Sequence, residues 1–243
     1  MKSILNDIIA HTHSLGGVEL VKVTGTDKET QINALAEDKS VIVSGTLKTA
    51  MPDFEGVFGM PNLSKLKTIL GFDDYDASSK ITVQRTQKDG VDAPSGIHFE
   101  TKNGDFINDY RLMSRTIIDE KIKNVTFKGA SWNIDFEPTV AGIMRLKKQA
   151  QANSEENTFT TKVENGDLKI FFGDVSTHSG NFVFHPHITG SLSRAWMWPI
   201  KQFLSIMDLV GDKTVKISDQ GAAEITVDSG LAVYRYLLPA QSK

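Results

Sequence analysis

The stretch that decides the fold runs from residue 134 to residue 148 and reads Ile134-Asp135-Phe136-Glu137-Pro138-Thr139-Val140-Ala141-Gly142-Ile143-Met144-Arg145-Leu146-Lys147-Lys148. A proline opens a segment of helical periodicity here, because Val140, Ile143 and Met144 recur at the spacing of one helix face. We expect this helix over residues 138–152, where three basic residues and no acidic residue occur. The stretch therefore predicts a cationic amphipathic helix.

Three other segments carry helical periodicity, and the order of elements repeats along the chain. These helices are expected over residues 2–14, 61–70 and 194–208. Pro61 and Pro199 open the second and fourth helices and lie 138 residues apart. A repeated order at one spacing predicts two similar domains in tandem, over residues 1–113 and 130–243, with a connector over residues 114–129.

Most of the remaining chain reads as short strands that alternate or carry β-branched residues between turn signals. The turn Asn165-Gly166 is a strong signal for a two-residue hairpin. The predicted fold class is α+β, with two helices packed on antiparallel sheets in each domain. Strands are expected over residues 18–23, 31–36, 41–47, 80–85, 96–100, 106–112, 158–163, 168–172, 181–185, 214–218, 222–227 and 231–238.

Composition excludes several classes of protein. The 243 residues are 40% hydrophobic, which is enough for a packed core and argues against a disordered chain. The absence of cysteine excludes disulfides, thiolate zinc sites and a cysteine nucleophile. No apolar stretch reaches 18 residues and the first residues lack a signal-peptide pattern, so we expect a soluble intracellular protein with no membrane partner.

A search for catalytic or metal-binding motifs finds weak candidates. The run from Gly211 to Thr214 ends like a phosphate-binding loop but lacks the first glycine at the required spacing. The pairs His11/His13 and His185/His187 have no accompanying carboxylate motif, and the acidic run 73–76 lacks the spacing of a calcium loop. We therefore expect no enzyme activity, no cofactor and no metal.

Charge is divided by element type. The four predicted helices hold eight basic and two acidic residues, whereas the rest of the chain holds 19 basic and 28 acidic residues. The simplest explanation of this division is that exposed helix faces often carry lysine. Glutamate is equally common there, however, so the division favours an anionic partner. The net charge of −3 hides this division.

The sequence resembles the DNA sliding clamps, most of all the polymerase processivity clamps of tailed bacteriophages and more distantly the proliferating cell nuclear antigen (PCNA). The resemblance rests on the tandem repeat, on residues 134–148 with the segments 157–160 and 166–170 that follow, and on the ending Tyr234-Arg235-Tyr236-Leu237-Leu238-Pro239-Ala240. It covers nearly the whole chain through pattern rather than through one invariant motif.

The resemblance implies a homotrimeric ring of six similar domains that encircles double-stranded DNA, with sheets outside and helices lining the hole. It implies DNA polymerase and a clamp loader as partners, processivity as the function, and the cytoplasm of an infected bacterial host as the location. Ring closure would pair residues 106–112 with residues 181–185 of the next subunit. The DNA-facing residues would be Lys2, Lys65, Lys67, Arg145, Lys147, Lys148, Arg194 and Lys201.

Clamps of this family also bind partner peptides in an apolar pocket beside the connector and the C-terminal tail. The corresponding stretches here supply Met113, Ile117, Ile118, Leu238 and Pro239. The main alternative is an oligomeric β-rich phage structural protein of the tail or baseplate, and a ligand-binding β-domain protein is a second one. The structural-protein alternative does not explain why the basic residues are concentrated on four helices, and the two-fold repeat of elements argues against the ligand-binding alternative.

Overall fold

The computed structural model describes residues 1–88, 91–122, 129–174, 176 and 178–241. The chain divides into two compact units: unit 1 is Met1–Thr126 with Ser229–Tyr234, and unit 2 is Phe127–Asp228 with Arg235–Lys243. Residues 229–234, which the sequence assigns to the second domain, are thus counted with unit 1. Of the connector predicted over residues 114–129, residues 123–128 lie outside the described residues.

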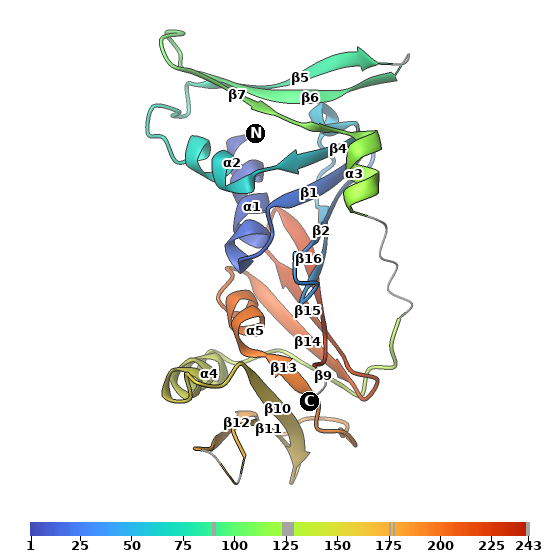
Figure 1. The fold of residues 1–243 in the computed structure, drawn as a ribbon, viewed down its shortest axis with the longest axis vertical. Coiled ribbons are helices and arrows are strands. Elements are labelled where there is room, and N and C mark those ends of the chain that lie inside the picture. The colour runs from blue at the N-terminus through green and yellow to red at the C-terminus, as the bar shows by residue number, and fades with distance from the viewer. Residues whose placement is uncertain (89–90, 123–128, 175, 177, 242–243) are drawn as a thin grey trace. The chain divides into compact units, whose positions relative to one another are not determined.

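Unit 1 contains two antiparallel sheets and, in its described residues, three α-helices (Figure 1). Within the unit the first sheet has the order β8-β4-β1-β2-β3 and the second has the order β5-β6-β7. The elements are α1 (Lys2–His11), β1 (Leu20–Gly25), β2 (Thr30–Leu35), β3 (Ile42–Leu47), β4 (Gly56–Pro61), α2 (Leu63–Leu70), β5 (Lys80–Lys88), β6 (Val91–Glu100), β7 (Ile107–Arg111), β8 (Met113–Ser114) and α3 (Arg115–Lys121).

Unit 2 is built in the same way, with one sheet in the order β12-β11-β10-β13 and another in the order β16-β15-β14-β9. The last strand, β16, begins in residues counted with unit 1 and ends in unit 2. The elements are β9 (Ile134–Phe136), α4 (Val140–Ala152), β10 (Thr158–Glu164), β11 (Asp167–Phe172), β12 (Gly180–His185), β13 (Met197–Pro199), α5 (Ile200–Met207), β14 (Asp212–Ser218), β15 (Ala222–Asp228) and β16 (Ala232–Pro239).

The two units repeat one order of elements. The order α1-β1-β2-β3-β4-α2-β5-β6-β7 is matched element by element by α4-β10-β11-β12-β13-α5-β14-β15-β16. The sheet orders match too, since β4-β1-β2-β3 corresponds to β13-β10-β11-β12. This confirms the predicted α+β fold with antiparallel sheets, and each repeat contains two helices, to which unit 1 adds α3. The predicted hairpin at Asn165-Gly166 is also confirmed, with both residues at positive φ.

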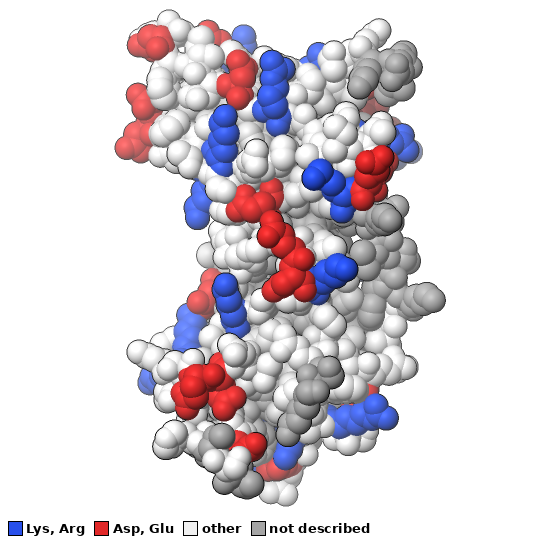
Figure 2. Space-filling model, viewed as in Figure 1, with Lys and Arg blue, Asp and Glu red and all other residues white. Residues whose placement is uncertain are grey.

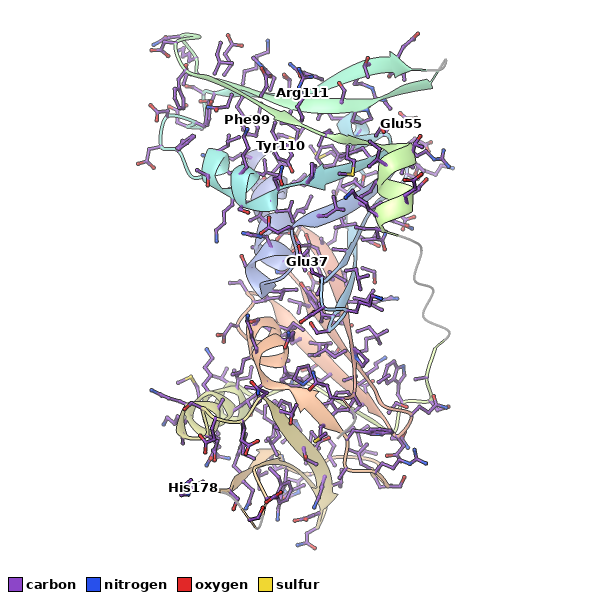
Figure 3. All side chains as sticks on the ribbon, in the orientation of Figure 1. Glu37, Glu55, Phe99, Tyr110, Arg111 and His178 are labelled. Atoms are coloured by element: carbon purple, nitrogen blue, oxygen red, sulfur yellow. The ribbon has the colours of Figure 1, made fainter. Side chains whose placement is uncertain are left out.

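Each core follows from the hydrophobic pattern. In unit 1, Leu5 and Ile8 of α1 and Leu63 and Leu66 of α2 are fully buried. Burying a side chain of this size contributes about 1.5–3 kcal/mol. Tyr110 of β7, labelled in Figure 3, is also buried, and its hydroxyl donates to the Pro61 carbonyl. Burial and the nearby Glu19 raise the pKa of Tyr110, which keeps that donor protonated.

The segment that returns to unit 1 is held by a buried polar cluster. The Lys48 backbone N–H donates to the Leu231 carbonyl at 2.9 Å, which sets the segment beside the end of β3. The Tyr234 ring stacks on His11 with centroids 4.5 Å apart, and its hydroxyl donates to Asp7 at 2.8 Å. Ser229 donates to the same carboxylate oxygen at 3.1 Å. These contacts explain why the last strand begins in unit 1.

Several local predictions were wrong. The described residues form a fifth α-helix, α3, which sequence periodicity missed because it spans seven residues. Pro61 ends strand β4 instead of opening a helix, and the left-handed residue Asn62 precedes α2. Strand β4 went unpredicted because two glycines and a proline depress its β-propensity. The first helix ends at His11, before the predicted residue 14, and the fourth begins at Ile200.

Candidate nucleic-acid interface

The helices form one pair in each unit. Helix α1 packs against α2 in unit 1, and α4 packs against α5 in unit 2. Each helix buries an apolar stripe against its own sheets and leaves a polar face uncovered. Figure 2 shows lysine and arginine side chains over α2 in unit 1 and over α4 and α5 in unit 2. These uncovered faces are the candidate surface for an anionic partner.

Helix α2 presents its lysines to solvent because its apolar residues occupy the other face. Leu66 is fully buried, whereas Lys65 and Lys67 are exposed. The start of the helix is held by Glu19, whose carboxylate accepts from the Ser64 hydroxyl at 2.7 Å and from the Ser64 N–H at 3.3 Å. Burial tends to raise the pKa of Glu19, but the hydrogen bonds from Ser64 and the nearby His13 hold it below its usual value. A charged carboxylate thus caps α2.

Helix α1 contributes less charge than the sequence suggests. Lys2 is half-buried and its ammonium donates to the Tyr75 backbone carbonyl. The second charged residue of α1, Asp7, belongs to the buried cluster with Tyr234. The exposed positions Ser3 and Asn6 are uncharged. Helix α1 is therefore nearly neutral on its open face.

Helix α4 carries the largest concentration of basic residues. Thr139 caps it by accepting the Gly142 N–H at 3.0 Å, and Leu146 is its fully buried anchor. Lys147 and Lys148 are exposed on the other side. Arg145 is also exposed, and its guanidinium donates to the Val183 carbonyl of β12 at 3.3 Å.

Helix α5 adds one exposed cation, Lys201. The residue that follows the helix, Asp208, forms an ion pair with Lys147 of α4. Arg194 lies outside α5, in a loop where its backbone N–H donates to Asp219 at 3.2 Å and its guanidinium lies 5.7 Å from the Trp196 ring. The structure thus places Arg194 apart from the helix face.

The eight predicted basic residues therefore differ in their surroundings. Within the described part of the chain, Lys147 is the member of this set whose side chain forms an ion pair with a carboxylate. Lys2 and Arg145 donate to backbone carbonyls. Four exposed lysines form no ion pair with any described residue, namely Lys65, Lys67, Lys148 and Lys201. Their direct roles in binding remain predictions.

Helix α3 lies beside strand β4 and was missed by sequence analysis. Its Ile118 is fully buried against Gly59, where an added Cβ would lie 2.8 Å from the isoleucine side chain. Lys22 of β1, itself buried, pairs with Asp119 at 2.7 Å. The hydrogen bond from Lys22 is the main cause that holds the pKa of Asp119 below its usual value. The helix is thus fixed to the sheet by one apolar and one ionic contact.

A groove of about 720 Å³ opens in unit 1 next to α3. Apolar residues from five elements or their ends line it, and Glu37, labelled in Figure 3, lines it together with Glu19. Sequence analysis predicted only one of the lining residues, since the others lie far apart along the chain. The apolar lining consists of Leu20, Leu35, Ala36, Pro61, Met113 and Ile122.

The predicted partner-binding residues are placed differently from one another. Met113 lines the groove and is half-buried, and Ile117 is 47% exposed. Ile118 and Leu238 are fully buried, which is the ordinary core position for such residues, while Pro239 is exposed. Contact between these residues and a partner stays a prediction.

Strands β7 and β12 are two of the strands that end their sheets with an unpaired edge among the described residues. Strand β7 is the last strand of the β5-β6-β7 sheet, and β12 is the last strand of the β12-β11-β10-β13 sheet. Ile107 on β7 is 50% exposed. Both strands lie within the segments that the sequence resemblance assigns to ring closure.

The weaker sequence motifs have structural roles. The ammonium of Lys213 donates to the Leu209 and Gly211 carbonyls, so it closes the turn after α5. His11 packs on Tyr234, and His13 pairs with Glu19 at 3.0 Å. Among the described residues there is no cluster of three or more histidine or acidic side chains able to hold a metal ion. Likewise, none of the described helices is long and apolar enough to span a membrane.

Solved structures of PCNA share this fold over essentially the whole chain. PCNA of A. fulgidus, bound to the C-terminal region of FEN-1, matches with a TM-score of 0.67 and 13% identity over 100% of this chain and 95% of that chain. PCNA of Entamoeba histolytica matches with a TM-score of 0.67 and 11% identity over 99% and 94%. PCNA of Thermococcus kodakaraensis matches with a TM-score of 0.65 and 9% identity over 99% and 97%.

No protein-family model matches the sequence, and no curated protein sequence matches it either. The structural likeness establishes the fold, which is that of the PCNA sliding clamps. The predicted clamp fold is thereby confirmed.

Proposed function

We propose that this protein is a DNA polymerase sliding clamp: a homotrimeric ring that encircles double-stranded DNA and tethers the replicative polymerase to it. The observation that carries the proposal is the position of the exposed lysines. In a clamp fold they lie on the open faces of helices in both units, at Lys65, Lys67, Lys148 and Lys201. A ring held on DNA by topology needs only weak, sequence-independent attraction to phosphates, which such lysines supply.

The internal repeat supports closure of the ring. In unit 1, the start of β16 lies beside β3, as the Lys48–Leu231 hydrogen bond shows. By the repeat, β3 corresponds to β12 and β16 corresponds to β7. A β12 edge would therefore be completed by β7, and both edges are unpaired in the described chain. Pairing β12 with β7 of the next copy uses both edges, and three two-unit chains would make a six-domain ring.

The partner proteins would bind away from the DNA-facing helices. A. fulgidus PCNA is bound to the C-terminal region of FEN-1 in its solved structure. We propose that the groove beside α3 accepts a peptide segment of DNA polymerase or of a clamp loader, with Met113 and Ile122 as apolar contacts. The resemblance of the sequence to the clamps of tailed bacteriophages supports a role in viral DNA replication in the cytoplasm of an infected bacterium.

The proposed role requires no chemistry from the chain. A clamp keeps another protein on DNA. We therefore expect this protein to raise the processivity of a polymerase without catalysing a reaction itself. We accordingly propose that the protein is not an enzyme and needs no cofactor.

The decisive experiment compares retention on circular and linear DNA of the same sequence. The protein is loaded on a nicked circle by its clamp loader, and half of the sample is then cut once with a restriction enzyme. A topological clamp stays on the circle and is lost from the cut DNA. Equal loss from both would contradict encirclement. Light scattering on the free protein tests the ring size, with three copies expected.

A further inference from the structure

The ion pair between Lys147 and Asp208 joins two helices of unit 2. Lys147 lies on α4, and Asp208 is the residue at which α5 ends. Both side chains remain open to solvent, with 42% and 51% of their surface exposed. An exposed pair of this kind contributes little to folding stability, because solvent screens it. Its presence on the helix face therefore has little effect on the fold and a direct effect on the charge of that face.

The position of Asp208 is unfavourable for α5 itself. The carbonyl groups at the C-terminal end of a helix carry partial negative charge, so cations are favoured there and a carboxylate is not. Among the described residues, Asp208 also interacts with Lys213, whose ammonium already donates to the Leu209 and Gly211 carbonyls. The ion pair that the Asp208 carboxylate forms there is with the ammonium of Lys147.

We propose that Asp208 weakens the hold of the helix face on DNA by occupying the Lys147 ammonium in place of a phosphate. This rests on the proposed function, and it names a residue that tunes the DNA-binding surface. A carboxylate and a phosphate accept the same charge-assisted hydrogen bonds from a lysine. A phosphate that approaches Lys147 therefore meets an ammonium whose charge Asp208 already partly neutralises, so its net attraction is reduced.

As a result, the strength with which Lys147 binds a DNA phosphate depends on Asp208. Lys148, next to it on α4, forms no ion pair with a described residue and engages a phosphate without competition. Lys147 contributes less, because Asp208 neutralises part of its charge. Such partial neutralisation suits a ring that must slide, because each strong phosphate contact would have to break at every step.

The test uses the full-length protein and a short fluorescent DNA duplex, with affinity measured by anisotropy over a range of salt concentrations. The variant Asp208→Asn removes the charge and keeps the shape of the side chain. We expect affinity at low salt to rise about threefold to tenfold, and the dependence of log affinity on log salt to steepen by about one. Asp212→Asn is the matched control, since Asp212 is also exposed and forms no ion pair with α4 in the described residues.

A double variant separates competition for Lys147 from simple repulsion of DNA. With Lys147→Ala in place, Asp208→Asn should give no further gain. A gain that persists in that background, or an equal gain with Asp212→Asn, would overturn the proposal. The variant Asp208→Ser serves in the same assay if Asp208→Asn does not fold.

The circular-DNA experiment distinguishes this inference from the proposed function. A wild-type protein that stays on circles and leaves cut DNA, combined with unchanged affinity of Asp208→Asn, would remove the inference alone. Loss of the wild-type protein from circles and cut DNA alike would remove the proposed function.

Discussion

Gly142 of helix α4 lies directly against the backbone of Phe184 in strand β12. A Cβ atom added at Gly142 would come within 2.3 Å of the Phe184 carbonyl oxygen, closer than real Cβ atoms approach backbone. The absence of a side chain thus lets the most basic helix lie on the strand that we propose closes the ring. Arg145 adds a hydrogen bond to the neighbouring carbonyl of Val183.

Replacing Gly142 by alanine should destabilise unit 2 although alanine is the better helix former. The gain in helix propensity is about 1 kcal/mol, whereas forcing a Cβ into a closed contact costs typically 1–3 kcal/mol and moves the backbone. We expect the urea midpoint of unfolding to fall, and subunit association to weaken because β12 shifts. Val140→Ala is the control, since Val140 is 79% exposed and lies two residues earlier on the same helix. An unchanged midpoint for Gly142→Ala would show that α4 can move away from β12 freely.

The Asp7 cluster should make unit 1 sensitive to acid. Burial tends to raise the pKa of Asp7, but hydrogen bonds with His11 and Tyr234 outweigh it and the pKa is lowered. A carboxyl group whose pKa is lowered by folding stabilises the fold above its unfolded pKa, about 3.9. That stability is lost as the pH falls through the lower, folded value.

The measurement is the free energy of unfolding from pH 7 down to pH 2. In Asp7→Asn this acid-dependent loss should shrink, and stability at pH 7 should fall by about 2 kcal/mol because a charged acceptor is removed. Asp73→Asn, at an exposed position, should keep the wild-type profile. Identical profiles for wild type and Asp7→Asn would exclude the cluster as the source.

The Lys22–Asp119 pair should control the attachment of helix α3. In Asp119→Asn, the buried ammonium of Lys22 loses its ion pair with the Asp119 carboxylate, which we expect to cost about 1–3 kcal/mol because Asp119 is itself partly exposed. Arg115 and Lys121 are already exposed, but release of α3 would unfold the backbone around them, so trypsin should cleave there faster. Glu120→Gln, at an exposed neighbouring residue, should leave cleavage unchanged. Equal cleavage of both variants would show that Ile118 alone holds the helix.

The lysines of helix α2 should account for about two phosphate contacts. The double variant Lys65→Ala/Lys67→Ala should reduce the salt dependence of DNA binding by about two and shorten retention on nicked circles, with the oligomer intact. Lys28→Ala/Lys102→Ala removes the same charge from exposed turns and should have no such effect. If both double variants bind DNA equally well, α2 does not face the DNA.

Local patterns were sufficient for most elements of the fold. Strand β11 alternates buried and half-buried residues, and α5 places Ile200, Phe203 and Met207 on one buried face, so both could be predicted from spacing. Helix α3 could not, because among its seven residues only Ile118 is buried and periodicity needs at least two turns of pattern. The same holds for part of the candidate site. The exposure of Lys65 and Lys148 could be predicted from the buried residues beside them.

By itself, the sequence determined the repeat, the strand and helix types and the concentration of basic residues on helices. These depend on residues a few positions apart, whose spacing selects helix or strand. Only the tertiary structure decided which charges remain available. Lys147 meets Asp208 some 60 positions later, Lys2 meets the carbonyl of Tyr75, and Lys22 meets Asp119. Such pairs depend on how helices and sheets pack, because electrostatic contact requires a few ångströms in space and no particular separation in sequence.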